Sequence, residues 1–319
     1  MFSSIKNFIR PYLSWYQPSG ENSIFLCGIP RSGSTWIMEL LGSLSGIRTI
    51  NEPCNIRFAR VRAELQVDSW MGLLQLDQTG RLEAYFREID SGKLRFLNPN
   101  PFVNRHFLTK RTLFKVIHLP AHLVHEISRK LGASFICLYR HPIPVALSRE
   151  VFPLFAEFTA GRYRNHFSVE QCALCDRLLE SGSHLEKGVA AWCLHYYLYD
   201  KRMRSEFKGE QNVIFYEECV LYPAETIQKM ERYLDVRFDC NVLRRAMKPS
   251  QVLAKSDGTT QDVLQNTKNS QERSRYLVSR WTERVSKDEC IQVQAILDLF
   301  GVKVYNAFDP MPQSMVRHD

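Results

Sequence analysis

The sequence predicts an α/β protein with a doubly wound, mainly parallel sheet and helices on both of its faces. Three observations predict it. Short apolar runs alternate with segments of helical periodicity, a glycine-bounded loop joins the first such pair, and no internal repeat or linker divides the chain. We therefore expect a single domain over residues 1–319.

The first predicted strand is the apolar run Ser23–Cys27, which leads into Gly28. A short loop follows to Gly33, and apolar residues then recur at helical spacing, at Trp36, Ile37, Leu40, Leu41 and Leu44. A strand, a glycine-bounded loop and a helix in this order form the first βα unit of a parallel sheet.

Three further strands are predicted at residues 112–117, 134–139 and 212–216. A helix that begins at Pro120 and is closed by Gly132 separates the first two, and another helix runs from Pro223 to about Leu234. Strands that alternate with helices in this way indicate a parallel sheet.

Three regions do not follow this alternation. Residues 51–111 and 150–185 are expected to be insertions. Residues 249–281 are polar, and a connection of that length inside a compact domain is typical of a lid or a mobile loop.

The composition is that of an ordinary globular protein, which excludes collagen-like, low-complexity and wholly disordered chains. Lys and Arg number 42 against 34 Asp and Glu, and the formal net charge of +8 suits an anionic ligand or polymer. No run reaches the ~18–20 apolar residues of a membrane span. The apolar run from Phe8 to Tyr16 is broken by Arg10 and Pro11, so we expect at most a weak contact with a membrane surface.

The nine cysteines do not form the pattern of a disulfide scaffold, because their number is odd and Cys27 and Cys137 lie inside apolar runs. A reducing compartment follows, and we expect a cytoplasmic protein. Cys172 and Cys175 have the spacing of a metal-binding pair but lack a second pair, so no metal site is predicted.

The loop Gly28–Thr35 predicts an anion site, because its backbone N–H groups lie at the N-terminus of the following helix. In loops that bind nucleoside triphosphates, G-x-x-x-x-G-K-[ST], a lysine stands where this chain has Ser34. The only basic residue of the loop is Arg31, and the strand to residue 139 continues into Arg140 rather than a magnesium-binding aspartate. The sequence therefore predicts a P-loop topology that holds a phosphate without Mg²⁺.

Two motifs resemble those of the sulfotransferases. Pro30–Trp36 (PRSGSTW) is similar to the family's 5′-phosphosulfate loop, P-K-S-G-T-T-W, and to the R-S-G-S-[ST] form of its carbohydrate branch. Arg140–Ser148 (RHPIPVALS) resembles the 3′-phosphate motif R-[DN]-P-x-x-[VA]-x-x-S, with His141 in place of the acidic or amide residue. Weaker likenesses are Tyr216-Glu-Glu and Trp281 with Phe300-Gly301. Carbohydrate-type or bacterial members are the most similar.

The resemblance implies that the donor is 3′-phosphoadenosine 5′-phosphosulfate (PAPS), that 3′,5′-adenosine bisphosphate is released and that no metal is required. By this resemblance Arg31 faces the 5′-phosphosulfate, Arg140 and Ser148 bind the 3′-phosphate, and Lys115 lies near the transferring sulfuryl group. The other implied donor contacts are Ser32, Gly33, Ser34, Thr35, Trp36 and Tyr216. Simple packing is the alternative for both aromatic residues, and a surface position is the alternative for the lysine.

The general base has two candidates, since the acceptor hydroxyl must lose a proton during transfer. Glu52 precedes Pro53, as in the carbohydrate enzymes. His118 precedes Leu119-Pro120, which resembles the K-T-H-L-P of the cytosolic small-molecule enzymes apart from one extra residue after Lys115. The sequence slightly favours Glu52 and leaves His118 open.

We therefore expect transfer of a sulfuryl group from PAPS to a hydroxyl or amine of a carbohydrate or other small metabolite. The two insertions would then lie on the acceptor side. A P-loop small-molecule kinase and a non-catalytic binder of an anionic polymer are the alternatives. No nucleic-acid-binding motif is present, so no nucleic-acid partner is expected, and the oligomeric state is left open.

Overall fold

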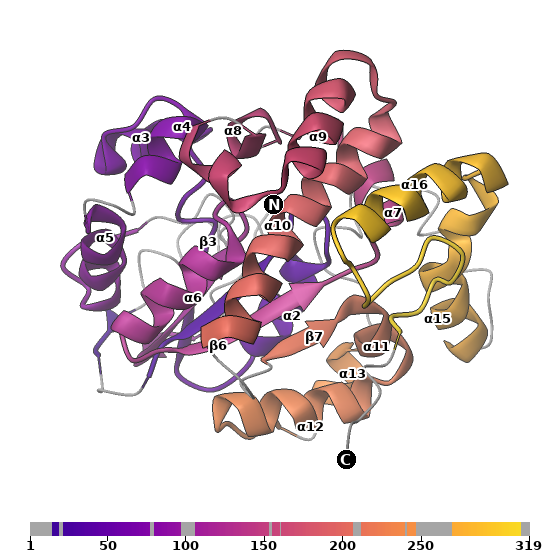
Figure 1. Ribbon diagram of the computed structural model, residues 1–319. Coiled ribbons are helices and arrows are strands. Elements are labelled where there is room, and N and C mark those ends of the chain that lie inside the picture. The colour runs from indigo at the N-terminus through magenta and orange to yellow at the C-terminus, as the bar shows by residue number, and fades with distance from the viewer. Residues whose placement is uncertain are drawn as a thin grey trace, which may run out of the picture. The chain divides into compact units, whose positions relative to one another are not determined.

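Figure 1 shows the chain as a computed structural model. The structure describes residues 15–18, 22–76, 80–96, 106–152, 155–159, 161–206, 212–239, 241–246 and 270–313. The chain divides into two compact units. Unit 1 comprises Met1–Gly28, Gly33–Leu138 and Pro223–Val252, and unit 2 comprises Ile29–Ser32, Tyr139–Tyr222 and Leu253–Asp319. The single domain over 1–319 stays a prediction.

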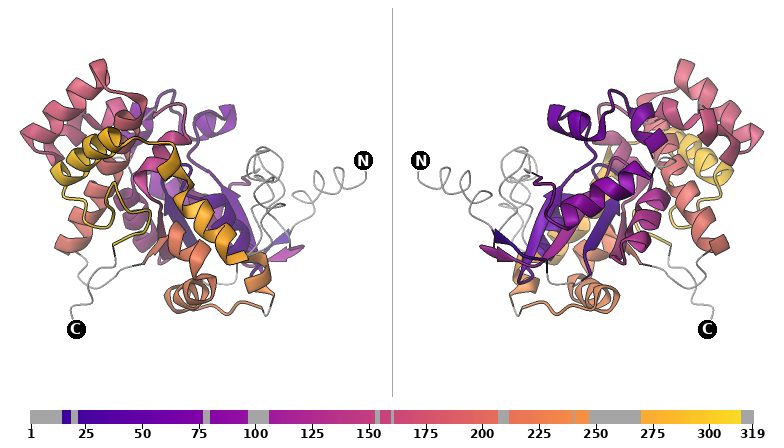
Figure 2. Two further views of the ribbon diagram at one scale, coloured as in Figure 1. Left: turned by 90° about the vertical axis from the view of Figure 1, so that its right-hand side faces the viewer. Right: turned by 90° about the vertical axis from the view of Figure 1, so that its left-hand side faces the viewer.

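The core of unit 1 is a parallel sheet whose strands lie side by side in Figure 2. Its order is β3 (Ile47–Asn51), β5 (Arg111–Val116), β2 (Ile24–Gly28) and β6 (Ser134–Tyr139). Every residue of β2, β3 and β5 is buried, as expected for parallel strands covered on both faces. The sheet confirms the predicted α/β class and the predicted strands of this unit to within a residue at each end.

The sequence predicts no strand at β3, because Arg48, Thr49 and Asn51 leave only two apolar residues in it. Burial lowers the pKa of this arginine to about 10, yet its guanidinium has several partners. Nε donates to Thr112 Oγ1 over 3.0 Å, Nη2 donates to the carbonyl of Ile89, and the group lies 3.2 Å from the ring centroid of Tyr16. A charged residue is tolerated in this buried strand because its hydrogen bonds are made.

The helices of unit 1 include the three that the sequence predicted. They are α2 (Ser34–Leu41), α6 (Ala121–Lys130) and α12 (Pro223–Leu234). The expected insertion at 51–111 contains α3 (Ala59–Leu65), α4 (Trp70–Gln75), α5 (Arg81–Asp90) and the short strand β4 (Leu108–Thr109), which pairs with β1 (Trp15–Tyr16). Helix α13 (Val242–Ala246) completes the described part.

Unit 2 is mainly helical (Figure 1). Its elements are α7 (Pro142–Leu147), α8 (Phe155–Thr159), η3 (Gly161–His166), α9 (Val169–Ser181), α10 (His184–Glu206), β7 (Val213–Phe215), α11 (Tyr216–Leu221), α15 (Ser270–Ser279), η5 (Arg280–Glu283) and α16 (Lys287–Leu299). Tyr216 begins a helix instead of ending the predicted strand. Of the expected lid, residues 249–269 lie outside the described residues, and 270–281 are helical.

Helices α7 and α10 of unit 2 pack without a side chain between them at Gly188. A Cβ at this position would lie 2.9 Å from Cα of Ala146 and 2.6 Å from the ring of Phe152. Four residues along α10, Trp192 Nε1 donates to the carbonyl of Arg140 over 3.0 Å. Helix α10 therefore holds the turn that leads from β6 into α7.

A buried polar network joins α7 and α11 to the C-terminal segment of unit 2. The ring of His141 is stacked on Trp281 at 4.5 Å between centroids, and its Nε2 lies 2.9 Å from the carbonyl of Asn306. The carboxylate of Glu217 accepts the backbone N–H of His141 over 2.9 Å and the hydroxyl of Tyr305 over 2.8 Å. These contacts connect segments that are far apart in the sequence.

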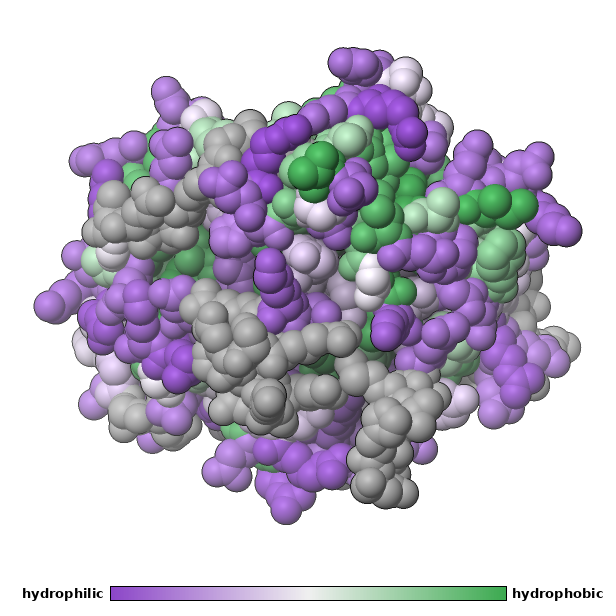
Figure 3. All heavy atoms as spheres, viewed as in Figure 1, coloured by the Kyte–Doolittle hydropathy of each residue, from purple (hydrophilic) through white to green (hydrophobic). Residues whose placement is uncertain are grey.

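The face of the molecule in Figure 3 is mostly hydrophilic, with apolar side chains gathered over α9 and α16. Exposed apolar residues on these helices are Val169, Leu179 and Ile291. Among the described helices, none is long and apolar enough to cross a membrane.

Replacing Gly188 with alanine is expected to destabilise the protein by about 1–2 kcal/mol. Because the added methyl group would meet the backbone of Ala146 at 2.9 Å, its overpacking costs about 2–3 kcal/mol, and the better helix propensity of alanine returns only about 1 kcal/mol. Urea unfolding measures the difference, with Lys187→Ala on the same helix as the control. A Gly188→Ala variant as stable as the wild type would contradict the packing described.

Acidification is expected to cost stability through His141. Burial lowers the pKa of this imidazole from 6.5 to about 4, so between these values only the unfolded chain takes up the proton. Its contribution is complete above about pH 6.5 and falls by about 3 kcal/mol as the pH decreases to about 4. Urea unfolding at pH 7 and pH 4.5 tests this. His141→Asn should lose less stability on acidification than the wild type, and an equal loss in both proteins would refute the assignment.

Candidate functional site

The loop between β2 and α2 has the backbone of an anion-binding turn. Gly33 precedes the first residue of α2 and has φ 91°, a left-handed conformation that glycine adopts without strain. Arg31 has φ 76°, which is unusual for a residue with a Cβ, and its side chain is exposed. Strain of this kind gathers at binding sites. Ser34 is the first residue of α2 and is buried.

Ser32 in this loop has a buried hydroxyl without a hydrogen-bond partner among the described residues. The residue is fully buried, and its backbone N–H donates to the carbonyl of Ile29 over 3.1 Å. A buried hydroxyl that lacks a partner costs free energy unless a ligand supplies one. The loop residues therefore fit a bound anion.

Lys115 lies at the centre of a cluster in unit 1. Its side chain is only 2 % exposed, and Nζ donates to Glu52 Oε1 over 3.0 Å, to Thr35 Oγ1 over 3.0 Å and to Asn51 Oδ1 over 3.2 Å. Burial lowers the pKa of this ammonium group, and the charge of Glu52 opposes that change. The surface position considered for Lys115 is therefore wrong.

Glu52 follows β3 directly and has φ 54°, again in the left-handed region. Its Oε2 accepts Asn55 Nδ2 over 2.9 Å and lies 3.3 Å from His118 Nε2. Burial by itself would raise the pKa of the carboxyl group, but the hydrogen bond from His118 and the charge of Lys115 outweigh it and hold the pKa well below its usual range. Glu52 is therefore ionised and already saturated with donors.

His118 lies two residues after the end of β5. It comes next to Glu52 because the sheet pairs β5 with β3, at whose end Glu52 lies. The His118 side chain is 14 % exposed, and its ring lies 5.2 Å from that of Trp70, the first residue of α4. With the proton on Nε2 for the carboxylate, the other nitrogen, Nδ1, is a proton acceptor. The structure thus brings both candidate bases into one hydrogen-bonded pair.

Arg140 follows β6 and belongs to unit 2. Its guanidinium lies 4.3 Å from the ring centroid of Tyr216, and Nη1 donates to the carbonyl of Arg31 over 3.1 Å. Its Nε is buried and has no partner among the described residues. Arg140, Tyr216 and the loop residue Arg31 are therefore neighbours, as a shared anion would require.

The positions of two other expected donor contacts, Ser148 and Trp36, do not point to a ligand. Ser148 follows α7 and is exposed, and its hydroxyl donates to the carbonyl of Val145 over 3.0 Å. No contact between Ser148 and Arg140 is found among the described side chains. Trp36 is half-buried on α2, so neither a core role nor an adenine contact is selected.

Sequence reasoning missed several members of these clusters. Asn51 and Asn55 flank Glu52 and hold its neighbourhood, and Glu217 directly follows Tyr216. In the sequence, only their positions close to motif residues mark these three residues as candidates. Trp70 carried no signal at all, because α4 lies 48 residues before His118 in the chain and only the fold brings them together.

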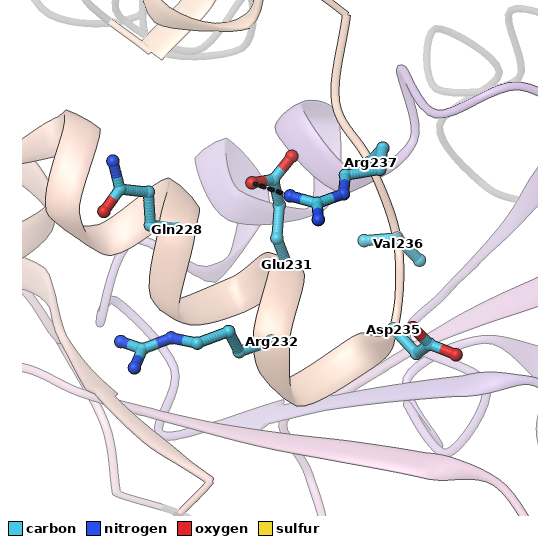
Figure 4. A pocket seen from close by; sticks show the side chains of 6 residues that line it. All are labelled: Gln228, Glu231, Arg232, Asp235, Val236 and Arg237. Atoms are coloured by element: carbon cyan, nitrogen blue, oxygen red, sulfur yellow. Dashed lines mark ion pairs between the residues drawn. The ribbon is translucent and has the colours of Figure 1, made fainter.

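Two other features lie apart from these clusters. Cys172 and Cys175 are buried free thiols on α9, and no metal-binding group of three or more ligands occurs in the part of the chain that the structure describes. A pocket of about 760 Å³ lies beside α12. Figure 4 shows the side chains that line it, among them Arg237 and Glu231, which form an ion pair of 3.5 Å. The pocket is lined by Gln228, Glu231, Arg232, Asp235, Val236 and Arg237, none of which the sequence motifs involve.

The solved structures that are similar to this chain include three sulfotransferases. The sulfotransferase domain from the curacin biosynthetic pathway is 18% identical, with 88% of this chain and 98% of that chain covered and a TM-score of 0.47. For the sulfotransferase domain of the Synechococcus PCC 7002 olefin synthase the values are 16%, 90%, 98% and 0.45. For mouse sulfotransferase SULT7A1 complexed with PAP they are 15%, 93%, 87% and 0.41.

No curated protein matches the chain. At their TM-scores the three solved structures add no weight to the assignment, which depends on the sequence instead. A family model described as "Sulfotransferase family" matches residues 23–240, more than half of the chain, and includes the β2–α2 loop, Arg140 and Tyr216. The chain belongs to the sulfotransferase family and is a sulfotransferase enzyme.

Proposed function

We propose that the enzyme uses PAPS as its donor and releases 3′,5′-adenosine bisphosphate. The observation that carries this proposal is that two of the buried polar atoms without a partner among the described residues are Ser32 Oγ in the loop and Nε of Arg140. Both are donors, and they belong to the two motifs that resemble the phosphate sites of the family. Anionic oxygens are the partners that such donors require.

In this proposal the loop binds the 5′-phosphosulfate, from which the transferred sulfuryl group comes. Backbone N–H groups from Ser32 to Thr35 and the helix N-terminus supply the donors. The exposed Arg31 stabilises negative charge that develops on the bridging oxygen, a type of stabilisation worth about 3–4 kcal/mol for one donor. Arg140 binds the 3′-phosphate, with Ser148 beside it, and Tyr216 and Trp36 contact the adenine. No metal is needed.

His118 is the general base in our proposal, and Glu52 orients it. The carboxylate of Glu52 is held ionised by Lys115 and His118, which makes it a poor proton acceptor, whereas it fixes the His118 tautomer that leaves Nδ1 basic. As the acceptor oxygen forms its bond to sulfur and the bond to the bridging oxygen breaks, Nδ1 takes the hydroxyl proton. We therefore favour His118 over Glu52 as the base.

The acceptor in this proposal is a carbohydrate or another small hydroxylated metabolite. The residues of 51–111 contribute Trp70 beside the base, and an aromatic ring in that position suits the apolar face of a sugar or a phenol.

The cysteines that the structure describes are all free thiols, which supports the expected cytoplasmic location.

Calorimetric titration tests the donor assignment. We expect 3′,5′-adenosine bisphosphate to bind at least about 10-fold more tightly than 5′-AMP, because the second phosphate adds a charge-assisted hydrogen bond. Arg140→Ala should abolish the difference and leave 5′-AMP binding unchanged, with Arg177→Ala, at an exposed position of α9, as the control. Equal binding of both nucleotides by the wild type, or Mg²⁺-dependent ATP binding in their place, would refute PAPS as the donor.

Chemical rescue tests the choice of base. His118→Gly should lower kcat by about 10²–10⁴-fold, the usual contribution of a general base, and added imidazole should restore part of it. Glu52→Gln should also lower kcat, but imidazole should not restore it, because the histidine is still present. Rescue of Glu52→Gly by formate, together with near-normal activity of His118→Gly, would assign the base to Glu52.

A further inference from the structure

Behind Arg140, unit 2 contains a carboxylate that the proposed donor site does not use. Glu217 is 1 % exposed, and burial raises its pKa. A carboxylate at this depth is costly to the folded state unless its oxygens are hydrogen-bonded. A neutral glutamine has the same shape and would fill the space at lower cost, so the charge calls for an explanation.

Two neighbouring residues, Arg140 and His141, contact two other neighbouring residues, Tyr216 and Glu217. The ring of Tyr216 faces the guanidinium of Arg140 at 4.3 Å, and the carboxylate of the next residue, Glu217, accepts the backbone N–H of His141 over 2.9 Å. On the other side, Trp192 Nε1 donates to the carbonyl of Arg140 over 3.0 Å. The peptide bond between Arg140 and His141 is therefore clamped at both its oxygen and its nitrogen.

The carboxylate does not use its charge to neutralise Arg140 directly. Oε1 accepts from His141, and Oε2 accepts the hydroxyl of Tyr305 over 2.8 Å. In the described part of unit 2, Glu217 forms no ion pair within 4.0 Å, and Arg140 Nε has no partner. The two neutral donors thus occupy Glu217 and leave the guanidinium for a ligand.

We propose that Glu217 is a positioning residue for the donor: through the His141 N–H it fixes the main chain of Arg140 so that the guanidinium meets the 3′-phosphate. Because Glu217 forms no ion pair with Arg140, a ligand that binds the guanidinium has no salt bridge to break. Because Arg140 Nη1 also donates to the carbonyl of Arg31, the same clamp steadies the strained residue of the phosphate loop. This inference rests on the proposed donor.

The test compares Glu217→Gln with Tyr305→Phe by titration with 3′,5′-adenosine bisphosphate and with 5′-AMP. Glu217→Gln retains the shape and removes the charge, and we expect it to weaken bisphosphate binding by about 10-fold while 5′-AMP binding stays within about twofold. Tyr305→Phe removes only the hydroxyl on Oε2 and should change the preference for the bisphosphate by less than about threefold. A thermal unfolding scan of each variant confirms that it is folded at the titration temperature.

The same variant in an Arg140→Ala background separates positioning from a general structural role. If Glu217 acts through Arg140, Glu217→Gln should add no further loss of preference for the bisphosphate once Arg140 is absent. Equal weakening of both nucleotides, no weakening, or an undiminished effect in the Arg140→Ala background would overturn the proposal for Glu217 alone. A wild type without preference for the bisphosphate would instead overturn the donor assignment and this proposal with it.

Discussion

The chemistry of unit 1 depends on one buried ammonium group. Lys115 projects from a central strand, and its three hydrogen bonds reach the first turn of α2 and the end of β3. A buried cation must have a counter-charge, and Glu52 supplies it. Because Glu52 in turn holds His118, the position of the histidine is set by the same lysine. The parallel sheet makes this possible by ending neighbouring strands at one edge.

Unit 2 also contains a buried charged group, the carboxylate of Glu217. Glu217 is satisfied by a backbone N–H and a tyrosine hydroxyl rather than by a cation, and this leaves Arg140 with its charge available. In unit 1 the buried charge of Lys115 is paired with Glu52, which holds His118, whereas in unit 2 the buried carboxylate of Glu217 forms no ion pair with Arg140. In the roles that we propose, the residue that touches the ligand is in both cases held by one that does not.

The sequence predicted β2, β5 and β6, whose apolar runs are recognisable even where β5 carries Lys115, and the loop that begins with Gly28. It missed β3, because the buried Arg48 interrupts its apolar pattern and finds its partners only in the folded chain. It named Glu52 and His118 as rival bases, since no pattern along the chain shows that they are 3.3 Å apart. Glu217 was overlooked for the same reason: its contact with His141 spans 76 residues, and a spacing rule does not reach so far.

Arg31 and Glu52 share a left-handed backbone that glycine would adopt at lower cost. At Arg31, whose side chain is exposed, glycine would relieve about 1 kcal/mol of backbone strain and remove the guanidinium. At Glu52 the same change would leave the buried ammonium group of Lys115 without its counter-charge, which costs more than the strain. Libraries selected only for heat resistance should therefore drift toward glycine at residue 31, retain Glu52, and lose the turnover that we assign to Arg31.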